Sequence, residues 1–253
     1  MSLLSNLKPQ DDVKGEEKDS VGGGRPVYDS GIYAGTIKLA YLQKSKGGAL
    51  GLFLTIETDD GKEITQAMYV TGGDSKGNKH YYEKDGEKFY LPGFNMANSL
   101  SMLTAGVPLF EVETETKTIA LYNYEAKGEV PTKVEVATGL MNKRIYVGLI
   151  KQEVQKTAKN EATGQYDPID GTRFENDIDK FFCAHDAFDK MTTSEIMAKK
   201  QDDTVVAAFY DTWDKANTGK VRDKTGGGKA KAGAPSAGKP AAAGGKPTSS
   251  LFA

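Results

Sequence analysis

The sequence predicts a mainly β protein with appended helices, that is, an α+β fold. Between residues 31 and 151, apolar and polar side chains alternate along several short segments, which is the pattern of half-buried strands. Glycine-rich and Asp-Gly turns separate these segments, as hairpins require. Helical spacing of apolar residues interrupts the strand region once and returns near residue 200.

The first strands predict a meander. Residues 1–29 are polar and rich in glycine, so we expect a flexible N-terminal arm, with the fold beginning near Ser30. The strand expected over residues 31–42 has a face that we expect to point inward, formed by Tyr33, Ile37, Leu39 and Tyr41. The next strand has the inward face Leu50, Leu52, Leu54 and Ile56, and residues 63–70 return as its hairpin partner.

The most distinctive segment is 79–91, where two runs of aromatic and basic residues flank Asp85 and Gly86. This Asp-Gly dipeptide supplies the positive φ angles of a tight hairpin turn. A ribbon that carries tyrosines between lysines can stack nucleic-acid bases and neutralise phosphates. The same aromatic side chains can instead fill a core on one side while the charges are solvated on the other. The segment alone leaves both interpretations open.

A helix follows the hairpin and divides the strands. Residues 94–105 have helical spacing, with Phe94, Ala97, Leu100 and Leu103 on one stripe, and Gly106 is the expected stop. Further strands are expected over residues 109–113, 118–124, 133–137 and 142–155, the last with Ile145, Val147 and Leu149 pointing inward. Five or more strands with an internal helix fit a small, partly closed barrel of the oligonucleotide-binding (OB) type. We therefore expect one OB-like domain over residues 30–218.

The C-terminal part of that domain is expected to be helical. Residues 156–173 form a polar excursion, and helices are expected after it. Thr192 and Glu195 form a capping box, and the aspartates at 202–203 can cap a further helix. The apolar stripe of that helix is expected to pack on the barrel or on a partner subunit, with base stacking by Trp213 as the alternative; its members are Val205, Val206, Phe209, Tyr210 and Trp213.

Charge is distributed unevenly along the chain. The net charge is −2, but residues 215–253 carry +7 and residues 1–214 therefore carry −9. This division argues against a domain that coats duplex DNA through its overall charge, so a nucleic-acid site must be a local groove. Residues 219–253, which consist mainly of Gly, Ala, Lys and Pro, predict a disordered basic tail whose apolar tip, Leu251 and Phe252, is a candidate partner-binding element.

The composition predicts a cytoplasmic protein without membrane association. No apolar run approaches the roughly 18 residues that a membrane helix needs, and the N-terminus lacks the apolar stretch of a signal peptide. The single cysteine, Cys183, excludes an internal disulfide, which fits a reducing compartment. We expect Cys183 to be a small core residue beside Phe181 and Phe182.

Motifs for catalysis and cofactor binding are weak. Residues 233–239 have the spacing of a phosphate-binding loop, but Pro240 stands where a magnesium-binding Ser or Thr is needed. Cys183 and His185 lack the second ligand pair that zinc requires, and His80 is remote in sequence. We therefore expect no enzyme, metal or cofactor. One acidic cluster consists of Asp167, Asp170, Glu175, Asp177 and Asp179. It lacks the spacing of a calcium-binding loop, and capping of a following helix explains its last three members equally well.

Three runs resemble single-stranded DNA-binding proteins of tailed phages: Gly31-Ile-Tyr-Ala-Gly-Thr-Ile-Lys, Gly51-Leu-Phe-Leu-Thr-Ile-Glu and Tyr90-Leu-Pro-Gly-Phe-Asn-Met-Ala-Asn. The resemblance covers residues 28–155. It implies an OB barrel that coats single strands in replication and recombination, a C-terminal tail that recruits replication or transcription proteins, and self-association. Members of that family end in an acidic tail with a terminal aromatic residue, whereas this tail is basic and matches only at Phe252.

We therefore hypothesise a non-enzymatic single-stranded DNA-binding protein of phage DNA replication or recombination, which can form homo-oligomers. The stacking candidates are Tyr81, Tyr82, Phe89, Tyr90, Tyr122 and Tyr146. The phosphate-binding candidates are Lys44, Lys46, Lys79, Lys84, Lys88, Arg144 and Lys151. One alternative is a single-stranded-DNA-binding transcription cofactor that recruits a phage RNA polymerase. The other is a metal-dependent nucleic-acid-processing enzyme that uses the acidic cluster.

Overall fold

The computed structural model describes residues 26–123, 126–160, 162–164 and 166–225. The strands are β1 (Gly31–Lys44), β2 (Leu50–Thr58), β3 (Glu63–Tyr69), β4 (Tyr81–Lys84), β5 (Glu87–Tyr90), β6 (Glu115–Asn123), β7 (Gly128–Val136), β8 (Arg144–Lys159), β9 (Tyr166–Cys183) and β10 (Val221–Asp223). The α-helices are α1 (Pro92–Thr104), α2 (Thr193–Lys199) and α3 (Phe209–Asn217), and the 3-10 helices are η2 (Asp74–Lys76), η3 (Leu109–Glu111), η4 (Thr138–Leu140) and η5 (Asp186–Phe188).

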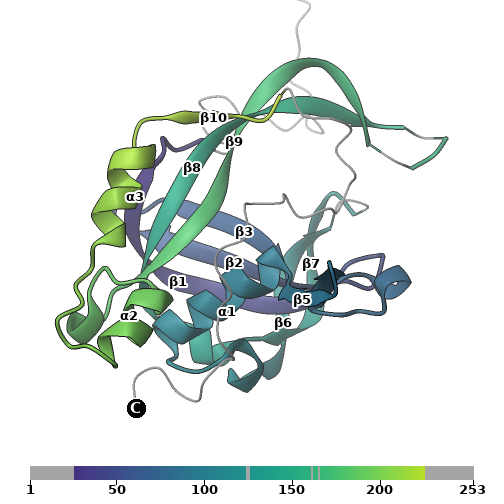
Figure 1. Ribbon diagram of the computed structural model, residues 1–253. Helices are drawn as coiled ribbons and strands as arrows, with labels where there is room; N and C mark the ends of the chain where they lie inside the picture. The colour runs from purple at the N-terminus through teal and green to yellow at the C-terminus, as the bar shows by residue number, and fades with distance from the viewer. Residues whose placement is uncertain (1–25, 124–125, 161, 165, 226–253) are drawn as a thin grey trace, which may run out of the picture.

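The strands form a mixed sheet of eight strands and a separate sheet of β4 and β5 (Figure 1). In the larger sheet the order is β10-β8-β1-β2-β3, with β9 added to β8 and the β6–β7 hairpin joined to β1 through β7. Its strand pairs are antiparallel, except that β10 runs parallel to β8. The α+β prediction is thus confirmed. The sheet is not a closed barrel, so the finer OB assignment stays a prediction.

Strand β1 forms pairs along both of its edges. One edge pairs with β2 over residues 35–44. The other edge pairs first with β8 over residues 31–36 and then with β7 at Tyr41 and Leu42. A bulge lies between Ile37 and Leu39, where the partner on this second edge changes. Strand β1 therefore joins the two halves of the sheet.

The bulge reverses the inward face of β1. Ile37 is fully buried before the bulge and Ala40 after it, so the inward positions move from odd to even residue numbers. The prediction that Leu39 and Tyr41 point inward is therefore wrong. Both are only partly buried, and among the described residues neither belongs to the main core. Tyr41 instead lies on the outer face of the sheet.

The main core lies between the sheet and α1 (Figure 1). The predicted inward residues of β8, Ile145, Val147 and Leu149, are fully buried. The predicted helical stripe forms the buried face of α1, with Phe94, Ala97, Leu100 and Leu103. Full burial of each large aliphatic side chain contributes about 1.5–3 kcal/mol, so this layer supplies most of the driving force for folding.

A smaller apolar cluster lies beneath α3. Its buried members are Ile150, Phe182 and Trp213. The indole Nε1 of Trp213 donates a hydrogen bond to Asp179 Oδ2 at 2.8 Å, so burial leaves this donor satisfied. A Cβ atom at Gly148 would lie 3.0 Å from the Trp213 ring, which explains the glycine in the middle of β8. The prediction that Trp213 is a core residue is confirmed.

The β8–β9 hairpin replaces a predicted polar excursion followed by helices. Strand β8 continues to Lys159, and β9 runs without interruption through the acidic cluster to the buried Cys183. Since residues 166–183 form one strand, the predicted helix capping by the last three acidic residues is wrong. Aspartate and glutamate are unfavourable in strands, and here their pairing with β8 outweighs that preference.

The remaining helical predictions are partly correct. The capping box of Thr192 and Glu195 is confirmed at the start of α2. Helix α3 begins at Phe209 and not after the aspartates at 202–203, and Val206 is 68% exposed instead of packed. The strand expected over residues 109–113 is mainly the 3-10 helix η3. Within the described ranges, no helix is long and apolar enough to cross a membrane.

A side chain bridges the gap between β3 and β9, which are not paired. The amide of Gln66 on β3 accepts a hydrogen bond from the Ile178 N–H at 3.2 Å and donates one to Asp177 Oδ1 at 3.1 Å. We call this gap the seam. The Gln66 amide thus takes the place of the backbone hydrogen bonds that would close a barrel there.

Both ends of the described chain are tied to the β8–β9 hairpin. The Tyr28 N–H donates to Asn176 Oδ1 at 2.8 Å, and the Lys151 N–H donates to Ser30 Oγ at 2.7 Å. The Gly219 N–H donates to the Ser30 carbonyl at 2.9 Å, just before β10 pairs with β8. The fold therefore starts before Ser30 and includes β10. The predicted arm thus extends slightly too far toward the C-terminus, and the predicted tail begins slightly too early.

Replacing Gln66 by alanine should lower the free energy of unfolding by about 1–3 kcal/mol, because the buried Ile178 N–H loses its acceptor. Urea denaturation followed by tryptophan fluorescence measures this change. The control is Glu63→Ala, an exposed position on the same strand, which should change the free energy by less than about 0.5 kcal/mol. Equal losses in the two variants would contradict the role assigned to Gln66.

Candidate nucleic-acid interface

The predicted aromatic hairpin is present as strands β4 and β5. Asp85 (φ 53°) and Gly86 (φ 80°) both have the positive φ expected of the Asp-Gly turn. Directly paired residues of antiparallel strands share a face. Tyr81 therefore shares one face with Tyr90, while Tyr82 and Phe89 share the other.

The Tyr82–Phe89 face offers an accessible aromatic surface. The two ring centroids are 5.7 Å apart with an angle of 29° between the planes, and Tyr82 is 41% exposed. Lys84, two residues after Tyr82 on β4, lies on the same face and is exposed. A base can stack on these rings while its phosphate meets the Lys84 ammonium.

Tyr81 lies between two ammonium groups. The Nζ atoms of Lys79 and Lys88 lie 5.5 Å and 5.1 Å from its ring centroid. Cation–π attraction of this kind holds the lysine side chains near the ring. The structure therefore brings seven of the predicted residues together on or beside one hairpin: Lys79, Tyr81, Tyr82, Lys84, Lys88, Phe89 and Tyr90.

Tyr90, in contrast, attaches the hairpin to the domain. Its ring centroid lies 4.8 Å from that of Phe94 on α1 and 5.5 Å from that of His80. It also packs against the main core. Of the four predicted stacking residues on this hairpin, Tyr90 is thus the one with a packing role.

A second aromatic group lies on the outer face of β1, β2 and β3. Tyr41 and Phe53 are paired in register, with ring centroids 5.1 Å apart and planes only 12° from parallel. Tyr69 on β3 lies edge-on to Phe53 at 6.4 Å and is 44% exposed. We call these three residues the aromatic ladder. Burial raises the pKa of the Tyr41 phenol.

Gly51 leaves room for the aromatic ladder. It lies opposite Tyr69 in the β2–β3 register. A Cβ atom at this position would lie 3.1 Å from the Phe53 ring and 3.3 Å from the Tyr69 ring. The absence of a side chain therefore lets two rings lie against the sheet.

Lysines gather at one end of the aromatic ladder. Lys44 is the exposed last residue of β1, an odd number of positions after Tyr41 and therefore not on the ladder's face, and Lys46 is exposed in the following turn. The Asp74 N–H donates to the Gly47 carbonyl at 2.8 Å, which holds η2 and the exposed Lys76 against this turn. Aromatic rings beside a cluster of cations are the combination that single-strand-binding grooves use.

Two predicted phosphate ligands are engaged in ion pairs. Arg144 donates two hydrogen bonds to Asp59, one of them from Nη2 to Oδ2 at 2.9 Å. These bonds lower the pKa of the Asp59 carboxyl and raise that of Arg144. Lys151 Nζ lies 3.0 Å from Asp29 Oδ1 and 5.3 Å from the Phe174 ring centroid. Arg144 therefore meets a phosphate only by giving up its bidentate partner.

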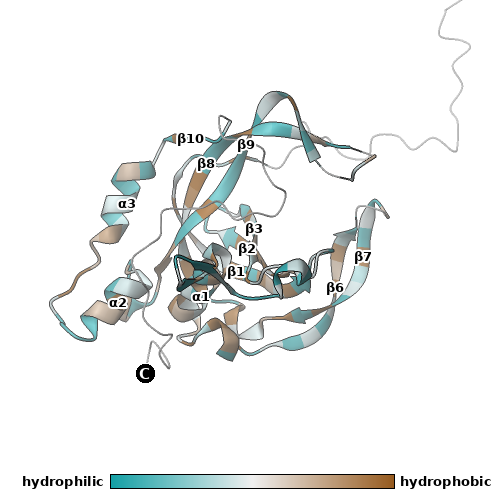
Figure 2. Cartoon of the chain, turned by 45° about the vertical axis from the view of Figure 1, so that its right-hand side comes forward, coloured by the Kyte–Doolittle hydropathy of each residue, from teal (hydrophilic) through white to brown (hydrophobic). Residues whose placement is uncertain are grey.

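The last two predicted aromatic residues differ in accessibility. Tyr146 packs edge-on against Tyr210 of α3, with ring centroids 5.8 Å apart, and burial raises the pKa of its phenol. Tyr122, near the end of β6, is 59% exposed. Tyr146 is thus part of the packing beneath α3, whereas Tyr122 lies on the projecting β6–β7 hairpin (Figure 2).

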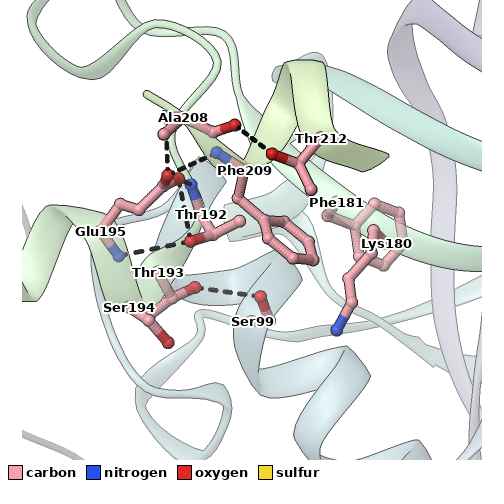
Figure 3. Close-up of a pocket in the computed structure, with 10 residues that line it drawn as sticks. All are labelled: Ser99, Lys180, Phe181, Thr192, Thr193, Ser194, Glu195, Ala208, Phe209 and Thr212. Atoms are coloured by element: carbon pink, nitrogen blue, oxygen red, sulfur yellow. Dashed lines mark hydrogen bonds between the residues drawn. The ribbon is translucent and has the colours of Figure 1, made fainter. Parts of the chain in front are cut away.

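A pocket of about 480 Å³ lies between α1, β9, α2 and the start of α3 (Figure 3). Its single carboxylate, Glu195, uses both oxygens: Oε1 accepts from the Ala208 and Phe209 N–H groups at 2.9 Å and 2.8 Å, and Oε2 accepts from the Thr192 N–H at 2.8 Å. Lys180 Nζ lies 6.0 Å from the Phe209 ring centroid. Glu195 thus joins α2 to α3, which is a structural role.

The acidic residues of β9 hold the C-terminal strand. Arg222 on β10 bridges to Asp179 Oδ1 at 2.8 Å and to Asp177 Oδ2 at 3.5 Å. Burial raises the pKa of Asp179, but hydrogen bonds from Trp213 and Arg222 outweigh it and leave this pKa lowered. Within the part of the chain that the structure describes, no three His, Cys, Asp or Glu side chains are grouped to hold a metal.

The chain matches no protein-family model and no curated protein. The candidate site is therefore defined by its geometry, and the resemblance to phage single-stranded DNA-binding proteins stays a prediction. Leu251, Phe252 and the glycine-rich segment 233–239 lie outside the described residues.

The sequence contained a partial signal for the aromatic ladder. Phe53 and Tyr69 occupy the outward positions of their strands, because Leu52 and Met68 beside them are buried. Alternation alone therefore places two of the three rings on the outer face. The position of Tyr41 depends on the bulge, which the alternation pattern does not reveal.

Tyr90→Ala should lower the free energy of unfolding by about 2 kcal/mol or more, since it removes the packing against Phe94 and the core. Tyr82→Ala on the same hairpin should lower it by less than about 1 kcal/mol, because it removes only a cross-strand pair. Urea denaturation of the two variants tests the division between packing and accessible rings. A larger loss for Tyr82→Ala would reverse the assignment.

Proposed function

We propose that this protein binds single-stranded DNA without catalysing a reaction on it. Bases stack on the aromatic ladder and on the β4–β5 hairpin, and lysines pair with the phosphates. The aromatic ladder carries this proposal, because it places three neighbouring rings on the outer sheet face, with Tyr69 44% exposed, and the exposed Lys46 and Lys76 lie in the segments that follow β1 and β3. Every base has a π face, so such a surface binds strands with little sequence preference.

The strand order supports a fold of the OB type. A β1–β2–β3 meander is followed by a helix, and β1 then pairs with two later strands, β7 and β8. OB domains bind oligonucleotides on the face of their second and third strands. Phe53 and Tyr69 lie on the corresponding strands β2 and β3. The Gln66 bridge in the seam is the counterpart of barrel closure in this interpretation.

The charge distribution favours single strands over duplexes. Non-specific duplex binding depends on many simultaneous phosphate contacts from a broadly basic surface. The whole chain carries a net charge of −2, and exposed lysines such as Lys38, Lys62 and Lys117 are paired with nearby carboxylates. Stacking therefore has to supply much of the affinity, and bases inside a duplex are not accessible for stacking.

Titration of the intrinsic fluorescence with oligothymidylate and with a matched duplex, each at two salt concentrations, tests the proposed function. We expect quenching and tight binding with the single strand, and affinity that falls as salt rises, because phosphate binding releases counterions. Equal affinity for the two forms, or no binding of the single strand, would refute the proposal.

Phe53→Leu combined with Tyr69→Leu should weaken oligothymidylate binding by about 1–3 kcal/mol for each stacked base, because leucine keeps the apolar bulk but has no π face. Thermal unfolding should change little, since both rings lie outside the main core. Phe110→Leu, at an exposed phenylalanine on η3, is the matched control and should bind as the unmodified protein does. Unchanged affinity in the double variant would exclude the aromatic ladder.

Lys44→Gln combined with Lys46→Gln should reduce the slope of log affinity against log salt by about 0.7 for each phosphate that is no longer neutralised. Arg144→Gln should leave the slope nearly unchanged, because its guanidinium already binds Asp59. Titrations at several salt concentrations compare the two variants. A flatter slope for Arg144→Gln than for the lysine pair would show that Arg144 exchanges Asp59 for a phosphate.

A further inference from the structure

The outer part of the β8–β9 hairpin, residues 153–159 and 166–174, projects as a two-stranded ribbon (Figures 1 and 2). We call it the distal hairpin. Strand β10 pairs only with residues 151–153 of β8, and in the described part of the chain β9 pairs with no strand but β8. Residues 166–174 are all exposed. A two-stranded ribbon of this kind has little stability of its own, so an unpartnered ribbon is a candidate binding element.

One face of the distal hairpin carries aromatic rings. Glu153 is paired with Phe174, and Lys159 with Tyr166, so the members of each pair point to the same side. Residues 153 and 159 are separated by an even number of positions along β8. The register irregularity between Gln155 and Thr157 adds two residues to β9, an even number, so the alternation is kept and both pairs lie on one face. Phe174 is 48% exposed and Tyr166 57% exposed. We call this side the ring face.

Lysines accompany both rings. The Lys151 ammonium lies 5.3 Å from the Phe174 ring centroid, and its position on β8 places it on the ring face as well. Asp29 accepts a hydrogen bond from Lys151 at 3.0 Å, which fixes this ammonium at the inner end of the ring face. Lys159 lies directly opposite Tyr166 and is exposed at the outer end. Each ring thus has a lysine neighbour, as on the β4–β5 hairpin.

Three acidic residues of β9, one in the distal hairpin and two beside it, lie on the opposite face. Asp167 is paired with Ala158, Glu175 with Gln152 and Asp177 with Ile150. These β8 partners alternate with the β8 residues of the ring face, so the three carboxylates point to the other side. Basic groups lie against two of these carboxylates: Arg222 and Lys224 reach Asp177 at 3.5 Å and 3.7 Å, and Arg173 reaches Glu175 at 3.3 Å. On the ring face, Glu153 accepts a hydrogen bond from Thr172. The ring face therefore suits a chain of phosphates and bases.

We propose that the ring face of the distal hairpin is a second stacking site for single-stranded DNA. It is engaged when a strand extends beyond the aromatic ladder and the β4–β5 hairpin. This inference rests on the proposed function, because a strand must first be held at those sites. The β6–β7 hairpin with the exposed Tyr122 extends to the same side of the molecule as the distal hairpin in both views (Figures 1 and 2).

Oligothymidylates of about 6 and about 20 nucleotides separate the two sites, because the first is shorter and the second longer than most single-strand site sizes of roughly 4–16 nucleotides. Tyr166→Leu combined with Phe174→Leu should weaken binding of the long oligonucleotide at least about fivefold, which corresponds to one stack of about 1 kcal/mol. Binding of the short oligonucleotide should stay unchanged. Phe110→Leu, outside the distal hairpin, should alter neither affinity.

Several results would overturn the proposal. An unchanged affinity for the long oligonucleotide, or an equal loss at both lengths, would exclude a second site on the ring face. Failure of the unmodified protein to bind either oligonucleotide would instead refute the proposed function itself. If sedimentation shows that the leucine substitutions only dissociate a dimer, the ring face binds a second copy of the chain and not DNA.

A charge variant gives an independent test that does not alter the rings. Lys159→Gln should flatten the salt dependence for the long oligonucleotide and leave that for the short one unchanged, because this ammonium neutralises a phosphate only when the second site is occupied. Lys156→Gln, one position out of phase on the same strand, is the matched control. Equal effects of the two variants at both lengths would count against the ring face.

Discussion

Strand β1 must form backbone hydrogen bonds along both of its edges, although its two halves belong to different parts of the sheet. The bulge between Ile37 and Leu39 makes this possible. A bulge adds one residue to a strand, increases its twist and exchanges the faces on which its side chains lie. The first half of β1 can therefore pair with β8, and the second half with β7. The same irregularity buries Ala40 and places Tyr41 on the outer face beside Phe53. The core and the aromatic ladder thus share one structural cause.

Ion pairs determine which cations a ligand can reach. Surface pairs contribute little to stability, but they fix the positions of long side chains and reduce the local positive potential. Arg144 is bound in this way to Asp59, and Arg222 to the carboxylates of β9. Lys84 and Lys88, in contrast, are exposed beside aromatic rings on the β4–β5 hairpin. Accessible cations and accessible rings therefore coincide on this hairpin and at one end of the aromatic ladder.

The sequence predicted what short-range chemistry controls. The Asp85-Gly86 turn, the capping box of α2 and the inward face of β8 depend on neighbouring residues, and all three are present. The fate of Arg144 depends on Asp59, which is distant in sequence, so a pattern of aromatic and basic residues could not assign it. Strand β9 could not be predicted because its acidic residues have partners on β10 and in the seam, beyond the reach of local propensity. The sequence does not reveal the bulge in β1 for a different reason. One added residue only shifts the alternation by one position, and the alternating pattern continues before and after it.

The hydrogen bonds between Ser30 and the segment before β10 have a mechanical consequence. Ser30 accepts from the Gly219 N–H through its carbonyl and donates through Oγ to the Lys220 carbonyl, so the two ends of the described chain are fastened directly to each other. We expect a force that pulls these ends apart to load this small clasp, the hydrogen bonds between Tyr28 and Asn176, and the three-residue strand β10 early. The long antiparallel pairings of β1, β2 and β8 lie outside the initial path of the load. We therefore expect the domain under tension to yield at these contacts before the sheet and its aromatic ladder unfold.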